Sequence, residues 1–371
     1  MKITILGRGN AGCISALHFY NYTKFLSKKI DIELIYNSKI DPVPVGQATL
    51  LDLPFFLWES TDWKNLTNFN FTQKRGIMYE NWGKKNKQWY HEFPLSTYGI
   101  HFNPKEFQDY VVNNLKINFK EKDENIISYD EIDSDYIIDC RGMPGDMNKY
   151  DSLVNPLNCS LLSSLPIDND VFWTRTIATP DGWCFYIPLK DRVSVGYNFN
   201  KNITSEKDAE KNFKNLMKVD KINKVFNFKQ YVAKKAIIDN RVFLNGNKLF
   251  FLEPLEATAM STYHMWCRFI WDSIIEKKVS LEDSEKKIKD YINKVQNFIL
   301  WHYSYGSIYK TKFWSYSKKL YKNNKNEEME KIIKETRTHN QFYLKTNHNL
   351  YKYAQWSGWN FKNWCDGMET S

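Results

Sequence analysis

The stretch Lys2-Ile3-Thr4-Ile5-Leu6-Gly7-Arg8-Gly9-Asn10-Ala11-Gly12 joins an apolar strand pattern to a glycine-rich turn, and apolar residues follow at helical spacing over residues 13–26. A G-x-G-x-x-G turn between a strand and a helix is typical of dinucleotide sites. The first glycine permits a tight turn, the second lets the backbone approach a pyrophosphate, and the third lets helix and strand pack closely. We therefore predict that a dinucleotide, with its phosphates at the helix N-terminus, binds at Gly7, Gly9, Ala11 and Gly12.

Two further stretches fit a parallel nucleotide-binding sheet. Residues 32–36 are predicted to form its second strand, which ends in Tyr36-Asn37-Ser38. The acid that binds the ribose of NAD is missing from this position, which argues against NAD as the cofactor. Residues 136–139 form another apolar strand, closed by Cys140-Arg141-Gly142 and then Gly145. A glycine turn after such a strand is where a second contact to the dinucleotide is expected.

The composition indicates a globular α/β protein. The 371 residues are 42% hydrophobic, which is ample for a sizeable core, and no run of about 18 apolar residues suggests a membrane span. Met1 leads directly into a strand, without a signal peptide, so we expect a cytoplasmic location. The six cysteines include no C-x-x-C pair, which favours reduced thiols over disulfides, and we expect no metal site.

The C-terminal part of the chain is basic and aromatic. Residues 301–371 carry 12 Lys and Arg against 6 Asp and Glu, together with 16 aromatic residues. This combination can bind single-stranded nucleic acid, but no known nucleic-acid motif accompanies it, and we expect no such partner. We predict instead a solvated basic face over an aromatic pocket.

A lysine stands out in the segment 69–82, which alternates like one strand. Its periodicity places Thr72, Lys74, Gly76 and Met78 on one face, where Lys74 is the lone charge. Such a lysine either extends its ammonium to water or is kept for chemistry by burial. Periodicity does not choose between these two interpretations.

Three other segments carry features that bear on a site. Residues 43–49 form a small-residue loop that is expected to run irregularly and could lie against a flat ligand. Residues 182–188 and 193–197 are predicted to be paired strands joined by a turn at residues 190–192. Ser280 with Asp283 is predicted to cap a helix that runs towards Tyr303.

Two carboxylates and a proline precede a long amphipathic run in the segment 251–260. The apolar spacing predicts a helix that begins near Thr258. Glu256 therefore lies close to a helix N-terminus, where unpaired backbone N–H groups favour an anion. Either Glu256 is an ordinary first-turn acid, or the N–H groups of Thr258 and Ala259 bind a small anion beside a functional carboxylate.

In this order the motifs resemble those of the flavin-dependent halogenases of the tryptophan halogenase family, over about residues 1–275. The matching motifs are the G-x-G-x-x-G turn, Gly46-Gln47-Ala48-Thr49 for a Gly-Glu-Ala-Thr loop, the strand with Lys74, Asp139-Cys140-Arg141-Gly142 for an Asp-Cys-x-Gly turn, Trp183-Cys184-Phe185-Tyr186-Ile187-Pro188 for a Trp-x-Trp-x-Ile-Pro signature, and Pro254-Leu255-Glu256-Ala257-Thr258 for a Pro-Leu-Glu-Ser-Thr block. Six motifs in the family's order agree with one another as independent observations.

The resemblance implies an α/β, Rossmann-like FAD-binding fold of the flavin monooxygenase type with a mostly helical substrate-side module. Residues 1–280 are expected to form the FAD-binding module, with substrate-side strands inserted at about 52–118. Residues 281–371 are expected to form a helical, aromatic-rich region packed on it. The cofactor residues that the resemblance implies, besides the glycine turn, are Gln47, Ala48, Thr49, Trp183, Ile187 and Pro188.

The resemblance also implies a reaction. FADH2 from a separate flavin reductase and oxygen would oxidise a halide (chloride, bromide or iodide) held at Thr258 and Ala259. The hypohalous acid would then reach Lys74 through a tunnel walled by Trp183, Phe185 and Ile187. Lys74 matches the family's catalytic lysine, which holds the oxidised halogen next to a small aromatic substrate. Glu256 matches its catalytic glutamate, which polarises the halogenating species or deprotonates the ring.

The chain departs from the family pattern at several positions. Phe185 replaces a tryptophan, Gln47 a glutamate, and Ala257 and Ala259 a serine and a glycine. No Gly-Asp turn for the flavin ribityl chain stands between Asn247 and Glu253, which predicts weak FAD binding. An aromatic hydroxylase of the same superfamily, or a lapsed flavoprotein that acts as a binding module, remains as an alternative. A homo-oligomer is possible.

Overall fold

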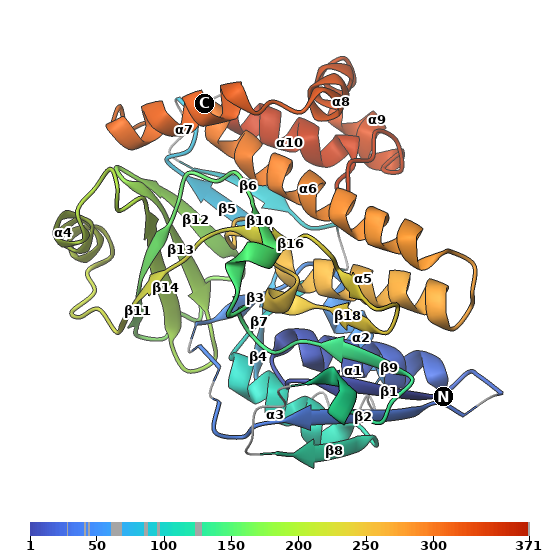
Figure 1. Ribbon diagram of the computed structural model, residues 1–371. Coiled ribbons are helices and arrows are strands. Elements are labelled where there is room, and N and C mark those ends of the chain that lie inside the picture. Colours follow the sequence, from blue (N-terminus) through green and yellow to red (C-terminus); the bar gives the residue numbers. More distant parts are fainter. Residues whose placement is uncertain are drawn as a thin grey trace. The chain divides into compact units, whose positions relative to one another are not determined.

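The computed structural model describes residues 1–27, 29–40, 42–43, 45–60, 69–84, 88–94, 97–122 and 128–369 (Figure 1). The chain forms two compact units, each built from three separate segments. The first unit consists of Met1–Thr72, Gly99–Ser152 and Tyr231–Ile292, and the second of Gln73–Tyr98, Leu153–Gln230 and Asn293–Ser371. This division differs from the boundary expected near residue 280, because residues 153–230 fold with the C-terminal helices.

The first unit contains a six-stranded sheet in the order β17-β18-β9-β1-β2-β8. Its strands are β1 (Lys2–Leu6), β2 (Asp31–Tyr36), β8 (Asn118–Glu121), β9 (Tyr136–Asp139), β17 (Ile237–Ile238) and β18 (Val242–Leu244). All neighbouring pairs are parallel except β17 with β18. The apolar runs of β1 and β9 are buried at the centre of the sheet, as expected of parallel strands covered on both faces. The predicted strands at 2–6, 32–36 and 136–139 are therefore confirmed.

Helices and short sheets complete the first unit. The helix after β1, α1 (Asn10–Thr23), starts earlier and ends earlier than the expected range 13–26. The other helices are α2 (Asp52–Ser60), α3 (Pro104–Asn114), α5 (Ala259–Ile274) and the 3-10 turns η2 (Tyr129–Glu131), η3 (Met147–Lys149) and η4 (Gly246–Lys248). One short sheet consists of β10 (Tyr150–Ser152), β16 (Tyr231–Ala233) and β19 (Phe250–Phe251). The other consists of β3 (Gln47–Ala48), β7 (Gly99–Phe102) and β4 (Phe71–Lys74). Of β4, only Phe71 and Thr72 belong to the first unit.

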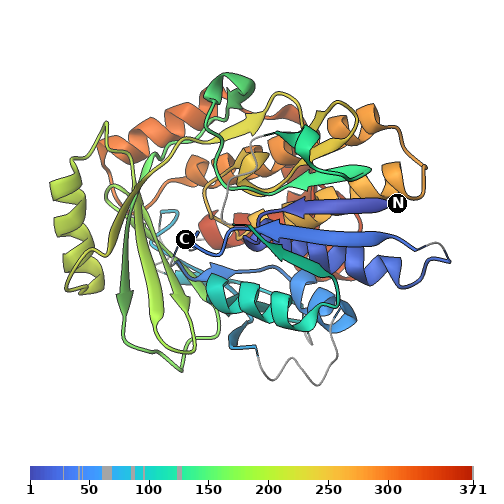
Figure 2. The same ribbon diagram turned by 60° about the horizontal axis from the view of Figure 1, so that its bottom comes forward.

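The second unit is built on a seven-stranded sheet in the order β15-β11-β14-β13-β12-β5-β6. Its strands are β5 (Gly76–Glu80), β6 (Gln88–Glu92), β11 (Cys159–Leu165), β12 (Thr174–Thr179), β13 (Gly182–Pro188), β14 (Val193–Phe199) and β15 (Lys224–Asn227). Strands β13 and β14 form the predicted antiparallel pair. One face of this sheet packs on α4 (Glu206–Met217), through buried residues that include Tyr197, Ala209 and Phe213 (Figure 2).

The segment expected to be one alternating strand is two strands. β4 ends at Lys74 and β5 begins at Gly76. Arg75 between them donates its N–H to the Phe172 carbonyl and accepts a hydrogen bond from the N–H of Phe93. The expected common face of Thr72, Lys74, Gly76 and Met78 is wrong. Residues 76–79 of β5 are buried whichever face of the sheet they point to, as in strands covered on both faces, so the strand shows no alternation.

The C-terminal region is helical, as expected. Its helices are α6 (Leu281–Tyr305), whose first part belongs to the first unit, α7 (Lys312–Asn323), α8 (Glu327–Arg337), α9 (Gln341–Thr346) and α10 (Gly358–Glu369). An indole N–H group ties it to the sheet, because Trp314 of α7 donates to the Thr179 carbonyl at 2.7 Å. All six cysteines are buried and free. Within the described ranges no helix could cross a membrane, and no three His, Cys, Asp or Glu side chains form a metal-binding group.

Candidate active site

The three glycines of the turn after β1 differ in the space around them. Gly7 has φ +90°, a left-handed conformation that favours glycine. A Cβ at Gly12 would lie 1.8 Å from the Gly7 carbonyl oxygen, so only glycine lets α1 pack this closely. A Cβ at Gly9 would meet nothing within 4 Å. Gly7 and Gly12 thus serve the fold in the predicted ways, while Gly9 leaves open space at the N-terminus of α1.

The loop after β9 lies against this turn. A Cβ at Gly7 would lie 3.1 Å from the Cys140 carbonyl oxygen and 3.4 Å from the Arg141 Cα. The buried Asp139 carboxylate fixes the loop, because it accepts the backbone N–H and the Nε–H of Arg141 at 3.0 and 2.9 Å and the Tyr129 hydroxyl at 2.7 Å. The two loops therefore meet at the carboxyl ends of neighbouring parallel strands, where doubly wound sheets bind their ligands.

A third loop at this edge was not predicted. Gly246 follows β18 in η4 with φ +63°, and a Cβ there would lie 2.5 Å from the Ala11 side chain. The Asn245 amide oxygen accepts the N–H of Gly246 at 2.7 Å, and its nitrogen donates to the Ser15 hydroxyl at 3.1 Å. The Asn-Gly pair is the sequence feature that could have indicated this turn. Asn247 follows Gly246. A glycine turn is therefore present just before the range 247–253, in which no Gly-Asp turn is found, and it carries an asparagine where the family has an aspartate.

The expected irregular loop at 43–49 is partly regular, and Pro44 lies outside the described residues. Gln47 and Ala48 form β3, which pairs with β7. Thr49 donates its N–H to the Ile100 carbonyl, and its hydroxyl accepts the N–H of Ile100, each at 2.9 Å. Backbone pairing with β7 holds this segment just before α2.

Glu256 lies in a turn before α5, and the simple first-turn interpretation is wrong. Helix α5 begins at Ala259 with Thr258 as its N-cap, as predicted, and its first turn contains no acid. The Ala257 N–H donates to the Pro254 carbonyl at 3.0 Å, while Glu256 and Ala257 have φ of +83° and +54°. The buried Glu256 is thus held in a conformation that non-glycine residues rarely adopt, as often occurs at functional sites.

The N-terminus of α5 retains the capacity to bind an anion. Thr258 makes no side-chain capping bond, and the first backbone N–H groups of a helix have no partner within it. Ser261, near the start of α5, donates its hydroxyl to the Asp52 carboxylate of α2 at 3.0 Å. Helices α2 and α5 are therefore joined within the first unit.

The left-handed turn predicts how substitutions at Ala257 change stability. Ala257→Gly is expected to raise the free energy of unfolding by roughly 0.5–1 kcal/mol, because glycine adopts φ +54° without steric cost. Ala257→Val is expected to lower it by about 1–3 kcal/mol, since a β-branched side chain fits this conformation worst. Ala209→Gly, inside α4, serves as the control and should destabilise the protein. Denaturant titration tests the order, and a destabilising Ala257→Gly would contradict the assigned turn.

Lys74 is fully buried at the end of β4, so its ammonium does not reach water. Its Nζ lies 5.4 Å from the centroid of the Phe93 ring, within the range of cation–π attraction. The pKa of His91 is lowered to about 3, mainly by burial and also by electrostatic interactions with His302 and Lys74. His91 is therefore a neutral imidazole beside a lysine within the second unit.

An aromatic cluster surrounds this part of the second unit, and no sequence motif indicates it. The His91 ring stacks on the Trp364 indole of α10 at 4.2 Å, and the Asn360 amide donates to His91 Nε2 at 3.0 Å. The Tyr79 hydroxyl lies 3.3 Å from His302 Nε2. The sequence feature that points to His91 and Phe93 is their closeness to the lysine strand, since Trp364 is about 270 residues away in the chain.

Strand β13 divides its side chains between two faces, as its alternation requires. Cys184 and Tyr186 belong to the core shared with α4. Trp183 and Phe185, on the opposite face, pack edge to face at 6.3 Å, with Ile187 next on that face. Trp183 is buried, and its indole N–H has no hydrogen-bond partner in the part of the chain that the structure describes. Pro188 ends the strand.

Most of this chain matches the sequence pattern of one protein family. The tryptophan halogenase family model matches residues 2–129 and 125–360. The chain belongs to the tryptophan halogenase family. Its curated relatives include tryptophan 6-halogenase ThaL of Streptomyces albogriseolus, 24% identical over 51% of this chain, and tryptophan 7-halogenase RebH of Lentzea aerocolonigenes, 25% identical over 51%. The matched region spans only 39% of each of these relatives.

Solved structures of this family share the fold. The tryptophan halogenase from Shewanella frigidimarina NCIMB 400 superposes with a TM-score of 0.83 at 18% identity, covering 99% of this chain and 88% of that one. BrvH, a flavin-dependent halogenase from Brevundimonas sp. BAL3, gives 0.79 at 17% identity, covering 99% and 90%. The predicted α/β, Rossmann-like FAD-binding fold is thereby confirmed.

In this halogenase-family chain the expected site residues fall into two groups. The first unit carries the glycine turn, the segment Gln47, Ala48 and Thr49, and the α5 group of Glu256, Thr258 and Ala259. The second unit carries Lys74, Trp183, Ile187 and Pro188. Their roles in binding and catalysis stay predictions.

Proposed function

We propose that this chain is a halogenase that uses FADH2, oxygen and a halide to halogenate a small aromatic substrate. The observation that carries the proposal is the buried Lys74 beside Phe93 and the neutral His91, in a chain of the tryptophan halogenase family. Burying a lysine is costly, so its retention in an aromatic setting favours a chemical role. A separate flavin reductase would supply FADH2.

The residues around the first turn fit FAD. The open space at Gly9 is where a pyrophosphate would approach the backbone, and the adjoining loops carry Arg141 and Gly246. Asn247 offers an amide where the family has an aspartate for the ribityl chain. Bound FADH2 would supply two electrons, so that oxygen, halide and a proton give hypohalous acid, FAD and water. We also propose that FAD contacts Gln47, Ala48, Thr49, Trp183, Ile187 and Pro188.

Matched alanine variants separate the roles of two glycines. Gly12→Ala is expected to unfold the nucleotide site at a cost of about 3 kcal/mol or more, because its Cβ would lie 1.8 Å from the Gly7 oxygen. Gly9→Ala should retain the wild-type melting temperature and bind FAD at least about tenfold more weakly, because the methyl group enters the pyrophosphate space. Thermal melting and FAD fluorescence titration measure the two effects. Unchanged FAD affinity in a folded Gly9→Ala protein would remove the pyrophosphate from this turn.

The start of α5 would serve the halide and the acid–base chemistry. Backbone N–H groups at Thr258 and Ala259 suit a halide, which needs donors and no proton chemistry. The Glu256 carboxylate would accept the proton that leaves the aromatic ring when the carbon–halogen bond forms. The left-handed turn would hold this carboxylate in one orientation and so pre-organise it.

Lys74 would hold the oxidised halogen against the substrate. Its ammonium can donate a hydrogen bond to the oxygen of hypohalous acid, which makes the halogen more electrophilic. The ring of Phe93, next to Lys74, offers a flat surface for an aromatic substrate. Trp183, Phe185 and Ile187 would exclude water from the route of the hypohalous acid.

Mass spectrometry of an aromatic library tests the proposal directly. The library of indoles, phenols and tryptophan is incubated with the protein, a flavin reductase, NADH, FAD, oxygen and one of chloride, bromide or iodide. We expect products in which one hydrogen is replaced by halogen, and only with reductase and halide present. An oxygen-containing product that forms without halide would favour the hydroxylase instead. Absence of any product across the three halides would favour a binding module.

A further inference from the structure

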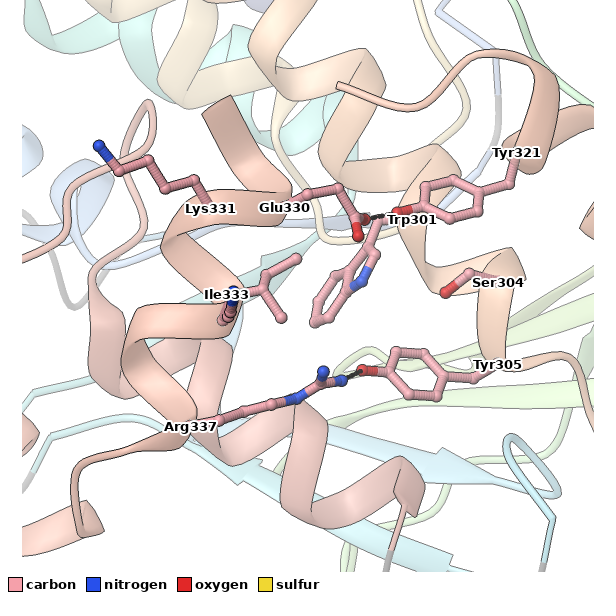
Figure 3. A pocket seen from close by; sticks show the side chains of 9 residues that line it. Trp301, Ser304, Tyr305, Tyr321, Glu330, Lys331, Ile333 and Arg337 are labelled. Carbon is pink, nitrogen blue, oxygen red and sulfur yellow. Dashed lines mark hydrogen bonds between the residues drawn. The ribbon is translucent and has the colours of Figure 1, made fainter. Parts of the chain in front are cut away.

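A pocket of about 600 Å³ lies among α6, α7 and α8 of the second unit (Figure 3). Trp301, Tyr305, Tyr321 and Ile333 supply its apolar and aromatic surfaces. This is the aromatic pocket beneath a basic face that the composition of residues 301–371 predicts, and that prediction is confirmed. Its volume falls in the range of small-molecule sites.

The floor of the pocket is fixed by packing. Trp301, Tyr321 and Ile333 are buried, and the Trp301 indole packs edge to face on Phe361 and Tyr305, with ring centroids 5.6 and 5.4 Å apart. Such pre-formed aromatic surfaces bind a flat ring at little cost in side-chain entropy.

The rim carries more positive than negative charge. Lys331, Lys334 and Arg337 follow one another at three-residue steps on α8, and Glu330 is the one carboxylate that lines the pocket in the described chain. Glu330 accepts the Tyr321 hydroxyl, and Arg337 pairs with Glu369 and donates to the Tyr305 hydroxyl at 3.3 Å. The Lys331 Nζ lies 3.9 Å from a carboxylate oxygen of Glu335. Lys334 is exposed and makes no ion pair with any residue that the structure describes.

We propose that this pocket binds a small aromatic carboxylate of one or two fused rings. The ring would lie on Trp301 and Ile333, and the carboxylate would pair with Lys334, with Arg337 next along the rim. A ligand with this charge complements the rim, because a cation would meet several positive side chains. This site does not depend on the proposed halogenation, since none of its residues belongs to the candidate active site.

Isothermal titration calorimetry with three probes of similar shape tests the charge requirement. Indole-3-acetate, indole-3-acetamide and tryptamine are titrated into the flavin-free protein at pH 7 and low salt. We expect indole-3-acetate to bind at least about tenfold more tightly than indole-3-acetamide, and tryptamine to bind weakest. Added salt should narrow the difference, because the rim is exposed to solvent. Equal affinity for the acid and the amide would overturn the proposal.

Three variants locate the binding. Lys334→Glu should weaken indole-3-acetate binding about tenfold or more, because it replaces the pairing charge by a repelling one. Glu330→Gln should tighten the binding severalfold. The amide removes the negative charge that opposes the carboxylate ligand, and its oxygen still accepts the Tyr321 hydroxyl. Lys322→Glu, an exposed reversal on α7 that does not line the pocket, is the control and should bind as the wild type does. If Lys334→Glu binds like Lys322→Glu, the ligand lies elsewhere and the proposal fails.

Discussion

Lys74→Ala is expected to reduce halogenated product by about 10³-fold or more, while FAD binding stays at the wild-type level. The reason is that the proposed task of the buried Lys74 ammonium is to hold the oxidised halogen. Product is measured by mass spectrometry with the halide that gives the highest turnover. FAD affinity is measured on the same preparation by fluorescence titration.

Folding needs its own control in this experiment, because removing a buried side chain can leave a cavity. Lys74→Met keeps most of the aliphatic stem and removes only the charge, and it should be as inactive as the alanine variant. Lys84→Ala, at an exposed lysine in the same unit, should keep full turnover. Full halogenation by Lys74→Met would exclude Lys74 from the reaction. Lost FAD binding would instead assign Lys74 to the cofactor.

Glu256→Gln is expected to lower product by about 10² or more without unfolding the protein. The amide has nearly the shape of the carboxylate, so the left-handed turn should survive, but it cannot accept the proton that leaves the ring. Because proton removal is the step affected, the variant should lose kcat more than substrate affinity. Steady-state kinetics with the best substrate of the library measures this difference.

The matched control is Glu282→Gln, at an exposed acid in the first turn of α6. It should retain full activity and melt at the wild-type temperature. A Glu256→Gln protein that halogenates as fast as this control would show that the carboxylate only stabilises the turn. A lower melting temperature with unchanged kcat in Glu256→Gln would also assign the carboxylate a role in stability and none in the reaction.

The sequence was sufficient where local geometry decides the structure. The turn at Gly7 and Gly12 follows from sterics within a few residues, and the structure shows the expected left-handed φ and the missing room for a Cβ. The start of α5 at Ala259 follows from apolar spacing of the same local kind. The family's motif order extended these local signals to the fold as a whole.

The sequence was insufficient where distant segments meet. The side chains of β5 are buried on both faces of its sheet, where Tyr79 stacks on His302, more than 200 residues away, so its period of two is lost. Gly246 needs to be glycine because Ala11 lies against it, more than 200 residues away in the chain. Neither contact leaves a pattern that a window of neighbouring residues can reveal.

By itself, the sequence determined the parallel sheet, the glycine turn, the helix that follows Glu256 and the helical, basic and aromatic C-terminal region. Only the tertiary structure decided that Lys74 is buried beside a neutral His91, that Glu256 lies in a left-handed turn, and that residues 153–230 fold with the last helices. The physical reason is that periodicity and turn sterics act between near neighbours. Desolvation of a charge depends instead on every segment packed around it, whatever its place in the chain.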